Sequence, residues 1–526
     1  MTNDDANIFV VFLELLKVKH TREYSNRYFN EHPHKYNLFG LSMMLSDYGV
    51  ENAATQIADK GKGLKAIETP FIAHFGGDFV VVYKADANGV AFFWKGNEHV
   101  LPVTQFIEAW SGIVLLAESS EKSIEPDYRE HRKRERLNFL NKATLVSVCC
   151  LILLLAYLNH ALYKNLGISI LLLLNLSGVY VSYLLLLKQM HVHSQYADKI
   201  CSLFKQNDCN NVLESKAAKL WGIFGWSEIG LGYFFTNVLI LAFSPSWVVF
   251  IAIINILTLP YSFWSVWYQK SNAKQWCVLC LIVQVLLWTL FITNVLLGYI
   301  SIPAFSFKTL LCLIFLGCCY LASILAINAL VPKLNAERTI PFLRQAINSI
   351  KADEKVFTAL LKQQPFFEAG DSDSILRFGN SSSPLRLTIL TNPYCAPCSR
   401  MHQRLERLLQ KMNNQISVQY ILSSFNESLN ATNKYLIALC LKRSNNIEQV
   451  FAEWFEKGKK LGDEFFRDHL LDIENPEVEV EFHKHEAWQK RTQLRATPTV
   501  LVNGYQLPEN YKVEDLRYFT EFQMKI

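Results

Sequence analysis

The chain has 526 residues, of which 51% are hydrophobic, and its formal net charge is +5, from 52 Lys and Arg against 47 Asp and Glu. A charge this small for the length gives no indication of nucleic-acid binding. The hydrophobic residues are concentrated in long runs in the middle of the sequence, so we predict a membrane core with a polar region on each side.

The first 119 residues are predicted to form a compact α+β domain. We expect an amphipathic helix over Asn7–Lys19 and a buried helix over Tyr36–Tyr48. The apolar runs Phe79–Tyr83 and Val90–Trp94 are typical of two strands joined by a turn. No signal peptide is expected here, because the opening is acidic and no small-residue cleavage site follows an apolar run.

Three segments of this domain form a recognisable pattern: the helix end Tyr48-Gly49-Val50, the run Asp78–Val82 and the closing run Phe106–Gly112. The pattern resembles the cysteine peptidase domain of bacteriocin-exporting transporters. In that family a Cys opens the helix, a His precedes the strand and an Asp follows the next strand, and the matching positions here hold Tyr36, Asp78 and Trp94. A thiolate nucleophile needs a sulfur and a base, and no Cys precedes Cys149. We therefore expect an inactive peptidase-like domain whose cleft either binds peptide or is a structural remnant.

Residues 120–142 form a basic linker, whose run Tyr128–Arg136 is expected to lie against anionic lipid headgroups. Six apolar stretches follow, and most approach the roughly 20 residues that cross a bilayer core. They are Ala143–Tyr163, Leu166–Leu187, Glu228–Phe243, Trp247–Tyr268, Cys277–Tyr299 and Phe307–Leu330. Six crossings return the chain to its starting side, so the two polar regions and the beginning of the fifth span should share one face.

Two physical arguments disagree about which face this is. Most of the flanking Lys and Arg residues lie on it, and by the positive-inside rule it would be cytoplasmic. The same face would carry three spaced cysteine pairs, Cys201/Cys209, Cys277/Cys280 and Cys395/Cys398. Dithiols that form disulfides belong in an oxidising compartment, because cytosolic reductants would reduce them. We give the redox argument more weight and expect an integral protein of the bacterial inner membrane, with its redox domains facing the periplasm.

The chain has twelve cysteines, and six of them form three spaced pairs: Cys201/Cys209, Cys277/Cys280 and Cys395/Cys398. The other six lie in apolar sequence, and we expect them to pack in the core as small hydrophobic side chains. Two Cys-x-x-Cys units can make a four-thiolate zinc site. Here one unit opens a membrane span, the other lies beyond further spans, and no His stands at zinc-finger spacing, so we expect no metal.

Electrons pass between dithiols through mixed disulfides, which require the sulfurs to approach within bonding distance. Cys201 and Cys209 lie in a polar segment and are separated by seven residues, so this pair can reach both a soluble partner and a fixed pair. Cys277 and Cys280 lie where a span begins and are expected to be that fixed pair. The acceptor nearest to this position is a membrane quinone.

The loop cysteines are followed by Asn210–Ile223, Ser227 and Gly230, and later by Cys277-Val278-Leu279-Cys280. This arrangement resembles the vitamin K epoxide reductase family in its bacterial form. The resemblance implies a four-helix bundle that holds a quinone, menaquinone or ubiquinone, near Cys280, with Ser215 close to the pocket. The additional N-terminal span departs from the family pattern.

Near the C-terminus, a predicted strand over Leu385–Thr391 leads into Cys395-Ala396-Pro397-Cys398 and a helix. A sulfur at a helix N-terminus has a lowered pKa, so Cys395 is the expected nucleophile and Cys398 the resolving thiol. The later run Ala496–Gly504 resembles the cis-proline strand of thioredoxin-like proteins. By that resemblance, Thr497 and Pro498 would face the dithiol and pair with the substrate backbone.

The predicted protein is multidomain. An α-helical membrane bundle, with a vitamin K epoxide reductase-like four-helix core plus extra spans, joins an N-terminal α+β papain-like domain to a C-terminal thioredoxin-fold α/β domain. The expected boundaries are 1–119 for the peptidase-like domain, 120–142 for the basic linker, 143–331 for the membrane domain, 332–384 for a second linker and 385–526 for the thioredoxin-like domain.

We expect a quinone-dependent thiol-disulfide oxidoreductase that forms disulfides in exported proteins or peptides. Electrons would pass from Cys395 to the loop pair through Cys209, from Cys201 to the membrane pair, and through Cys280 to the quinone pool. Three alternatives stay open: a quinol-driven disulfide reductase, a peptide-export accessory whose N-terminal domain binds a cysteine-containing peptide, and a true epoxide reductase.

Overall fold

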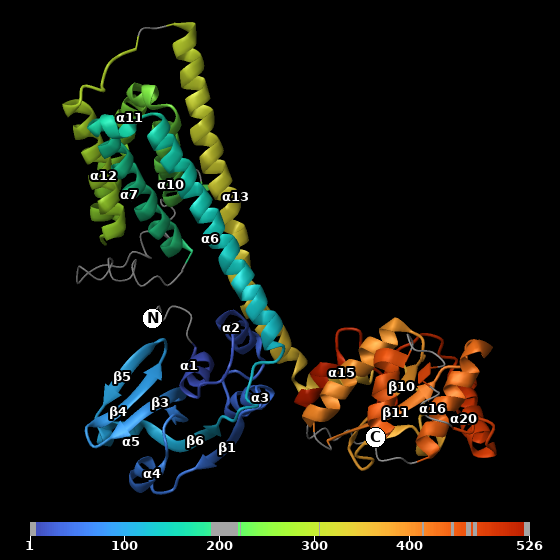
Figure 1. The fold of residues 1–526 in the computed structure, drawn as a ribbon. Helices are drawn as coiled ribbons and strands as arrows, with labels where there is room; N and C mark the ends of the chain where they lie inside the picture. The colour runs from blue at the N-terminus through green and yellow to red at the C-terminus, as the bar shows by residue number, and fades with distance from the viewer. Residues whose placement is uncertain are drawn as a thin grey trace. The chain divides into compact units, whose positions relative to one another are not determined.

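The computed structural model describes residues 7–190, 219–220, 222–303, 306–412, 415–442, 447–458, 464–465 and 471–519. The chain divides into two compact units, residues 1–30 with 35–343 and residues 31–34 with 344–526. The first unit contains a sheet domain and a helical bundle, and the second contains another sheet domain (Figure 1).

A six-stranded antiparallel sheet forms the N-terminal domain, in the order β1-β6-β2-β3-β4-β5. Its strands are β1 (Glu51–Gln56), β2 (Phe71–Phe75), β3 (Asp78–Asp86), β4 (Gly89–Trp94), β5 (Asn97–Leu101) and β6 (Trp110–Glu118). The helices are α1 (Ile8–Leu15), α2 (Arg22–Glu31), α3 (Leu38–Asp47), α4 (Lys60–Ala66) and α5 (Val103–Ala109). Alternate strand residues point to opposite faces: Ile72 and Val81 pack with α1 and α3, whereas Phe71 and Val80 pack with Phe106.

The two helices expected at the start of this domain correspond to α1 and α3, which are shorter than predicted. Each begins directly after an asparagine whose side chain accepts a backbone hydrogen bond from the first turn, Asn7 from Val10 and Asn37 from Gly40. Such caps satisfy backbone donors that a helix leaves unpaired at its start. The two expected strands are β3 and β4.

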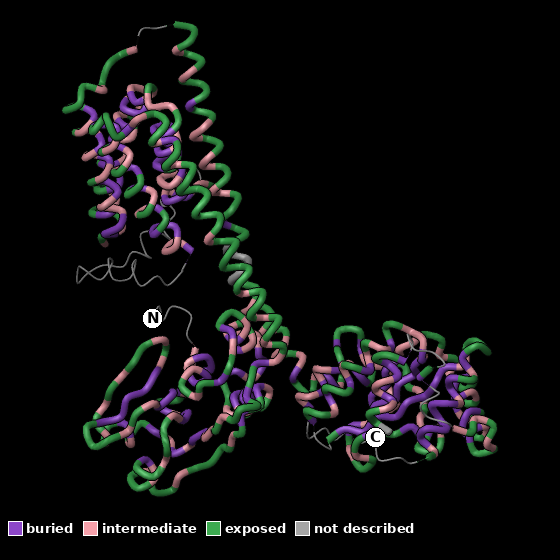
Figure 2. The backbone as a smooth tube through the Cα atoms, in the orientation of Figure 1, coloured by how far each residue is buried: buried purple, intermediate pink, exposed green. Residues whose placement is uncertain are grey.

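Within the described residues, six helices are long and apolar enough to cross a membrane. They are α6 (Tyr128–Asn159), α7 (Leu166–Gln189), α10 (Trp226–Phe243), α11 (Val248–Tyr268), α12 (Val278–Leu296) and α13 (Phe307–Lys351). In the most apolar windows of α7 and α10 to α12, 33–61% of the residues are buried, against 6% in α6 and α13. The four central helices therefore form the bundle core, and many residues of the other two are exposed along their length (Figure 2).

Two of these helices, α6 and α13, are much longer than predicted. Helix α6 begins at Tyr128, so the basic run is helical and continuous with the first span, which agrees with the absence of Gly and Pro between Tyr128 and Asn159. Helix α13 extends to Lys351, beyond the expected end at Leu330, and contains Pro332 and Pro341. A proline removes one backbone hydrogen bond from a helix, and this helix continues through both.

The second unit contains a five-stranded sheet in the order β13-β12-β10-β11-β9, in which β10 and β11 run parallel and the other pairs antiparallel. Its strands are β9 (Arg377–Gly379), β10 (Leu385–Thr391), β11 (Ile416–Leu422), β12 (Thr499–Val502) and β13 (Tyr505–Gln506). The helices are α14 (Glu354–Leu361), α15 (Ala396–Met412), α16 (Asn430–Leu441), α17 (Ile447–Glu453), a π-helical turn (Trp454–Gly458) and α20 (Pro476–Thr492).

This sheet domain includes two elements, α14 and β9, that lie within the predicted second linker, residues 332–384. Strand β9 pairs with β11, and Phe357 and Leu361 of α14 are fully buried in the same core as β10. The fold therefore begins before Leu385. Short elements such as β9 carry too little periodic sequence to be recognised without their partners.

Candidate functional sites

The Cys277/Cys280 pair lies at the beginning of α12. Cys277 precedes the helix, and its Sγ accepts a hydrogen bond of 3.4 Å from the backbone N–H of Cys280. The backbone N–H of Cys277 donates to Oε1 of Gln269 at 2.9 Å, from the turn that follows α11. Cys277 is fully buried and Cys280 is half-buried, so the two sulfurs are held in one turn but differ in access.

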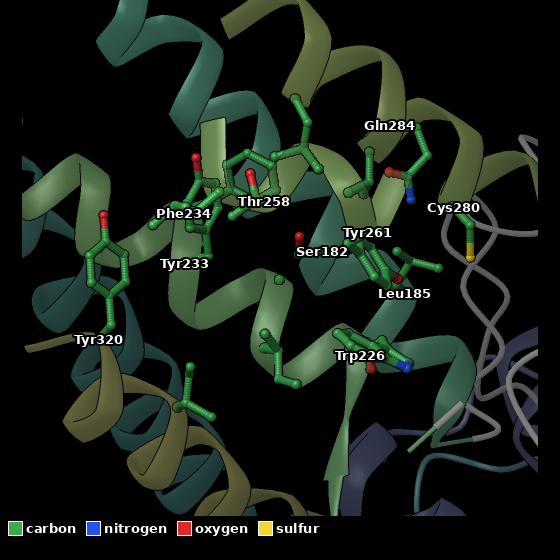
Figure 3. Close-up of a pocket in the computed structure, with 17 residues that line it drawn as sticks. Ser182, Leu185, Trp226, Tyr233, Phe234, Thr258, Tyr261, Cys280, Gln284 and Tyr320 are labelled. Carbon is green, nitrogen blue, oxygen red and sulfur yellow. The ribbon is translucent and has the colours of Figure 1, made fainter. Parts of the chain in front are cut away.

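A cavity of about 310 Å³ lies inside the bundle, and Cys280 lines it (Figure 3). Helices α7, α10, α11, α12 and α13 all contribute to its wall, which is mostly apolar and aromatic. Cys280 lies at one end of the displayed wall and Tyr320 of α13 at the other. The volume of the cavity is in the range of sites that bind small molecules.

The buried polar groups that line this cavity include the Ser182 hydroxyl on α7 and the Gln284 amide on α12, one turn after Cys280. Among the residues that the structure describes, Oγ of Ser182 and Oε1 of Gln284 have no hydrogen-bond partner. A buried polar atom without a partner costs about 1–3 kcal/mol. The cavity thus offers two unmatched polar atoms, Oγ of Ser182 and Oε1 of Gln284, and Cys280 lines the same cavity.

Glu228, at the beginning of α10, is a buried carboxyl group held by three amide donors. Its oxygens accept from the Gly225 backbone at 3.3 Å, from Gln189 of α7 at 3.2 Å and from Asn328 of α13 at 2.7 Å. Because a charged group inside a membrane protein is costly unless it is paired, this network ties three helices together. Glu228 is not among the site residues predicted from the sequence, although an acidic residue at the start of an apolar span is a signal for it.

Three predicted residues, Cys201, Cys209 and Ser215, lie outside the described residues. The helix before them, α7, ends at Gln189, and the helix after them, α10, begins at Trp226. These two helix ends are joined by a hydrogen bond that the Ser227 hydroxyl donates to Oε1 of Gln189. Ser227 itself lines the cavity.

Cys395 and Cys398 lie where β10 leads into α15. The Cys395 carbonyl accepts from the backbone N–H of Ser399 at 3.1 Å, which starts the first helical turn. Cys398 is fully buried, and its Sγ accepts from the backbone N–H of Asn392 at 3.4 Å. Burial raises the pKa of the Cys398 thiol. Cys395 is only partly buried, so the first sulfur of the pair is the accessible one.

The segment before β12 lies beside this dithiol. The peptide bond between Thr497 and Pro498 is cis, and Sγ of Cys395 lies 3.8 Å from the Thr497 carbonyl oxygen. Strand β12 pairs with β10, which leads directly to Cys395. The sheet therefore brings together two segments that are about a hundred positions apart in the chain.

In the N-terminal domain, the structure brings together two of the three positions that correspond to the peptidase residues. The indole Nε1 of Trp94, at the end of β4, donates to Oδ2 of Asp78, at the start of β3, at 3.2 Å. Tyr36 precedes α3 and is 73% exposed, with Nζ of Lys35 4.9 Å from its ring centre. The positions that match the family's Cys, His and Asp thus hold a tyrosine and a hydrogen-bonded carboxylate–indole pair.

Three family models match separate parts of the chain: the Peptidase C39 family over residues 12–122, the vitamin K epoxide reductase family over 169–295 and a thioredoxin family over 372–521. These matches confirm the predicted domain arrangement. A comparison with curated proteins finds no match.

Among solved structures, BdbD from Bacillus subtilis is similar at 11% identity, with a TM-score of 0.26, over 30% of this chain and 96% of its own. A periplasmic thioredoxin-like protein from Salmonella enterica serovar Typhimurium is similar at 16% identity, with a TM-score of 0.25, over 32% of this chain and 96% of its own. The catalytic domain of Proteus mirabilis ScsC is similar at 14% identity, with a TM-score of 0.26, over 32% of this chain and 98% of its own.

The fold, the dithiols and the family matches agree on one description. Six helices of the described residues are long and apolar enough to cross a membrane. The two Cys-x-x-Cys pairs lie at the beginning of α12 and at the beginning of α15. The chain is a membrane thiol-disulfide oxidoreductase that combines a Peptidase C39-like domain, a vitamin K epoxide reductase-like domain and a thioredoxin-like domain.

Proposed function

We propose that this protein forms disulfide bonds in exported proteins or peptides and transfers the electrons to a membrane quinone. The observation that carries the proposal is the cavity beside Cys280, which combines an apolar wall with two polar atoms that lack partners in the described part of the chain. A redox sulfur that borders such a cavity can exchange electrons with a ligand inside it.

The residues around the cavity fit a quinone. The Ser182 hydroxyl can donate to a ring carbonyl, and Oε1 of Gln284 can accept from a ring hydroxyl, so the oxidised and the reduced ring each find a partner. The aromatic wall, which includes Trp226 and Tyr261, suits a flat ring. A bound quinone would supply an acceptor for two electrons and two protons.

Access from the lipid supports the same ligand. Leu257 of α11 lines the cavity and is also 72% exposed. In a helix that spans a membrane, such a residue faces the hydrocarbon. A cavity wall that includes a residue facing the hydrocarbon favours a ligand that is dissolved in the bilayer.

The chain's own thiols would act in series. A substrate dithiol reduces the disulfide between Cys395 and Cys398 through a mixed disulfide on Cys395, and the substrate leaves oxidised. Cys395 then passes the electron pair to the loop pair at Cys209, and Cys201 reduces Cys277/Cys280. Each exchange breaks one S–S bond and forms another, so sulfur oxidation states balance at every step.

The structure supports this division of roles at both fixed ends. Cys398, buried and held by the Asn392 N–H, suits the resolving thiol, while the more accessible Cys395 lies beside the Thr497 carbonyl, where a substrate backbone can be bound. At the other end, Cys280 borders the cavity and Cys277 is anchored by Gln269. Joining both modules in one chain replaces a bimolecular encounter with an intramolecular one.

We place the redox domains on the periplasmic side of a bacterial inner membrane. If all six candidate spans cross, the chain would return to its starting face, and the segment between the second and third spans, Cys277 and the C-terminal dithiol would share that face. Dithiols that are used to make disulfides remain oxidised only outside the reducing cytosol.

Trapping of the mixed disulfide tests the relay. In the full chain, the Cys398→Ala variant cannot resolve a disulfide on Cys395, so a bond from Cys395 to Cys209 or Cys201 should accumulate and be found by non-reducing peptide mapping. The matched control is Cys440→Ala, which removes another buried thiol of the same unit, one whose pKa burial raises to about 12. If Cys395 is found only on other proteins and the loop pair is untouched, the intramolecular route is wrong.

A second role, for the N-terminal domain, is favoured by the Asp78–Trp94 contact. The fold of the peptidase-like domain is kept, but the two positions form a hydrogen bond that does not activate a nucleophile. We propose that this domain binds a cysteine-containing peptide without cleaving it. Deleting residues 1–119 should then change which peptides are oxidised and leave oxidation of a small dithiol unchanged, whereas equal loss of both would contradict a binding role.

A further inference from the structure

His402 is a buried titratable residue beside the C-terminal dithiol that the proposed relay does not use. It lies on α15, one turn after Cys398, and is 6% exposed. Its ring is stacked on Phe455, with ring centroids 3.4 Å apart, and on Tyr420, at 4.5 Å. Burial lowers the pKa of His402 to about 3, so the imidazole is neutral at physiological pH.

Thr391, the last residue of β10, connects this imidazole to the resolving thiol. Its Oγ1 lies 3.4 Å from Nε2 of His402. Against the burial that raises the pKa of Cys398, hydrogen bonding by the Thr391 side chain lowers it. All three side chains are buried. The backbone N–H of Asn392 reaches the same sulfur, so Cys398 has a backbone neighbour and a side-chain neighbour that can both donate to it.

The tautomer of His402 decides what the Thr391 hydroxyl can do. A hydroxyl has a single proton to donate. If Nε2 accepts that proton, Thr391 has none left for Cys398. If Nε2 carries a proton and donates it to Oγ1, the Thr391 proton is free to be donated to the sulfur. The first arrangement favours a Cys398 thiol and the second a Cys398 thiolate.

We infer that His402 is a positioning residue that donates to Thr391 and thereby directs the Thr391 hydroxyl proton to the Cys398 thiolate each time the disulfide opens. The inference rests on the proposed function. When a substrate thiolate attacks Sγ of Cys395, the bond between Cys395 and Cys398 breaks, a bond between the substrate and Cys395 forms, and Cys398 leaves with the electron pair.

The second substrate thiol then displaces Cys395 and closes the substrate disulfide. The two protons released by the substrate balance the two that the cysteine thiolates take up. Opening is faster when the leaving sulfur is the weaker base, and a buried thiolate depends on its donors because no water solvates it. Charge-assisted hydrogen bonds of this kind are about twice as strong as neutral ones.

Other titratable groups around the pair do not replace this contact. Cys395 belongs to the dithiol itself, and Tyr420 of β11 has its pKa raised by burial, with Glu406 and Glu448 acting on it through their charge. Burial is the cause that lowers the pKa of His402. The neutral imidazole therefore acts by orienting a hydroxyl and carries no charge of its own.

The test uses the full chain with Cys201, Cys209, Cys277 and Cys280 replaced by Ser, so that only the C-terminal disulfide is scored. The probe is dithiothreitol, and opening of the disulfide is followed by rapid quenching, alkylation and mass spectrometry. His402→Met, which fills the space without a donor, and Thr391→Val should each open about tenfold more slowly, the factor that corresponds to about 1.4 kcal/mol.

Three further measurements separate positioning from a merely structural effect. His402→Gln keeps an N–H donor and should recover most of the rate, the double variant His402→Met/Thr391→Val should be no slower than Thr391→Val, and the titration of Cys398 should move to higher pH in His402→Met. Tyr420→Phe, which keeps the ring that packs on His402, is the matched control and should open at the parent rate.

The results that overturn the inference are an unchanged opening rate or an unchanged Cys398 titration in His402→Met, or equal loss in His402→Met and His402→Gln. A parent chain whose disulfide is not reduced by the dithiol at all would contradict the proposed function instead. The two failures are therefore distinguishable in the same experiment.

Discussion

Replacing Gln284 by Leu tests whether the bundle cavity holds a quinone ring. Leucine has a similar size, removes both polar atoms of the amide and leaves the apolar wall in place. In the described part of the chain, Oε1 of Gln284 is buried without a partner, so the amide is placed as though to meet a ligand. The change should therefore weaken ligand binding without harming the fold.

The two effects should have opposite signs. A net hydrogen bond contributes about 0.5–1.5 kcal/mol, so loss of the contact should raise the quinone KM by about two- to twelvefold, since 1.4 kcal/mol corresponds to a factor of ten. At the same time the variant removes an orphaned buried oxygen, whose desolvation destabilises the empty protein by about 1–3 kcal/mol. We expect the ligand-free variant to unfold at the same temperature as the parent or slightly higher.

The assay follows quinone reduction by the full chain at saturating dithiol while the quinone concentration is varied. Ser182→Ala, on the facing helix α7, should produce a second loss of similar size. The kcat supported by the C-terminal dithiol should change little, because neither residue contacts it. An unchanged KM in both variants, with normal stability, would refute the assignment of the cavity as the quinone site.

Two other changes test how the bundle and the C-terminal domain are held together. Asn328→Leu removes the 2.7 Å amide donor from buried Glu228 and should destabilise the bundle by about 1–3 kcal/mol, measured by thermal unfolding in detergent, whereas Asn141→Leu on the exposed side of α6 should have no effect. In the C-terminal domain, burial opposes ionisation of Glu481, but hydrogen bonds from His485, Lys484 and the Ile375 N–H outweigh it and lower the pKa of Glu481 to about 2. Because the folded-state pKa lies below the ordinary value of 4.5, ionised Glu481 contributes about 3 kcal/mol of stability that is fully present above about pH 4.5 and is lost as the pH falls toward 2. Glu481→Gln should remove this dependence in hydrogen exchange of α20, and a parent chain that shows no loss between pH 5 and pH 2 would contradict the sign.

The sequence was sufficient to predict the three domains because their signals are local. A Cys-x-x-Cys at a strand-to-helix turn and another at the beginning of an apolar span can each be recognised within a few residues, and the structure places them at the beginning of α15 and of α12. Strand β10 has the bounds that its apolar run predicted. Helix ends were less predictable, since α13 continues through Pro332 and Pro341 where a proline usually favours an end.

The details of the cavity could not be predicted, because they depend on contacts between helices far apart in the chain. Ser182 and Gln284 are about a hundred positions apart, and nothing local distinguishes them from other polar residues in apolar spans. Glu228 becomes informative only when Gln189 and Asn328 are seen to hold it. The same is true of Asp78 and Trp94, whose direct hydrogen bond depends on the register of β3 and β4.

The most direct test of the central claim is quinone reduction by the purified full chain with a reduced dithiol peptide as the electron source. The account predicts one quinol formed for each peptide disulfide, with quinone reduction abolished in Cys280→Ala and in Cys395→Ala and unaffected in Cys440→Ala. Peptide oxidation that continues at the parent rate in Cys280→Ala, with no quinol formed, would contradict the claim that electrons leave through the membrane pair.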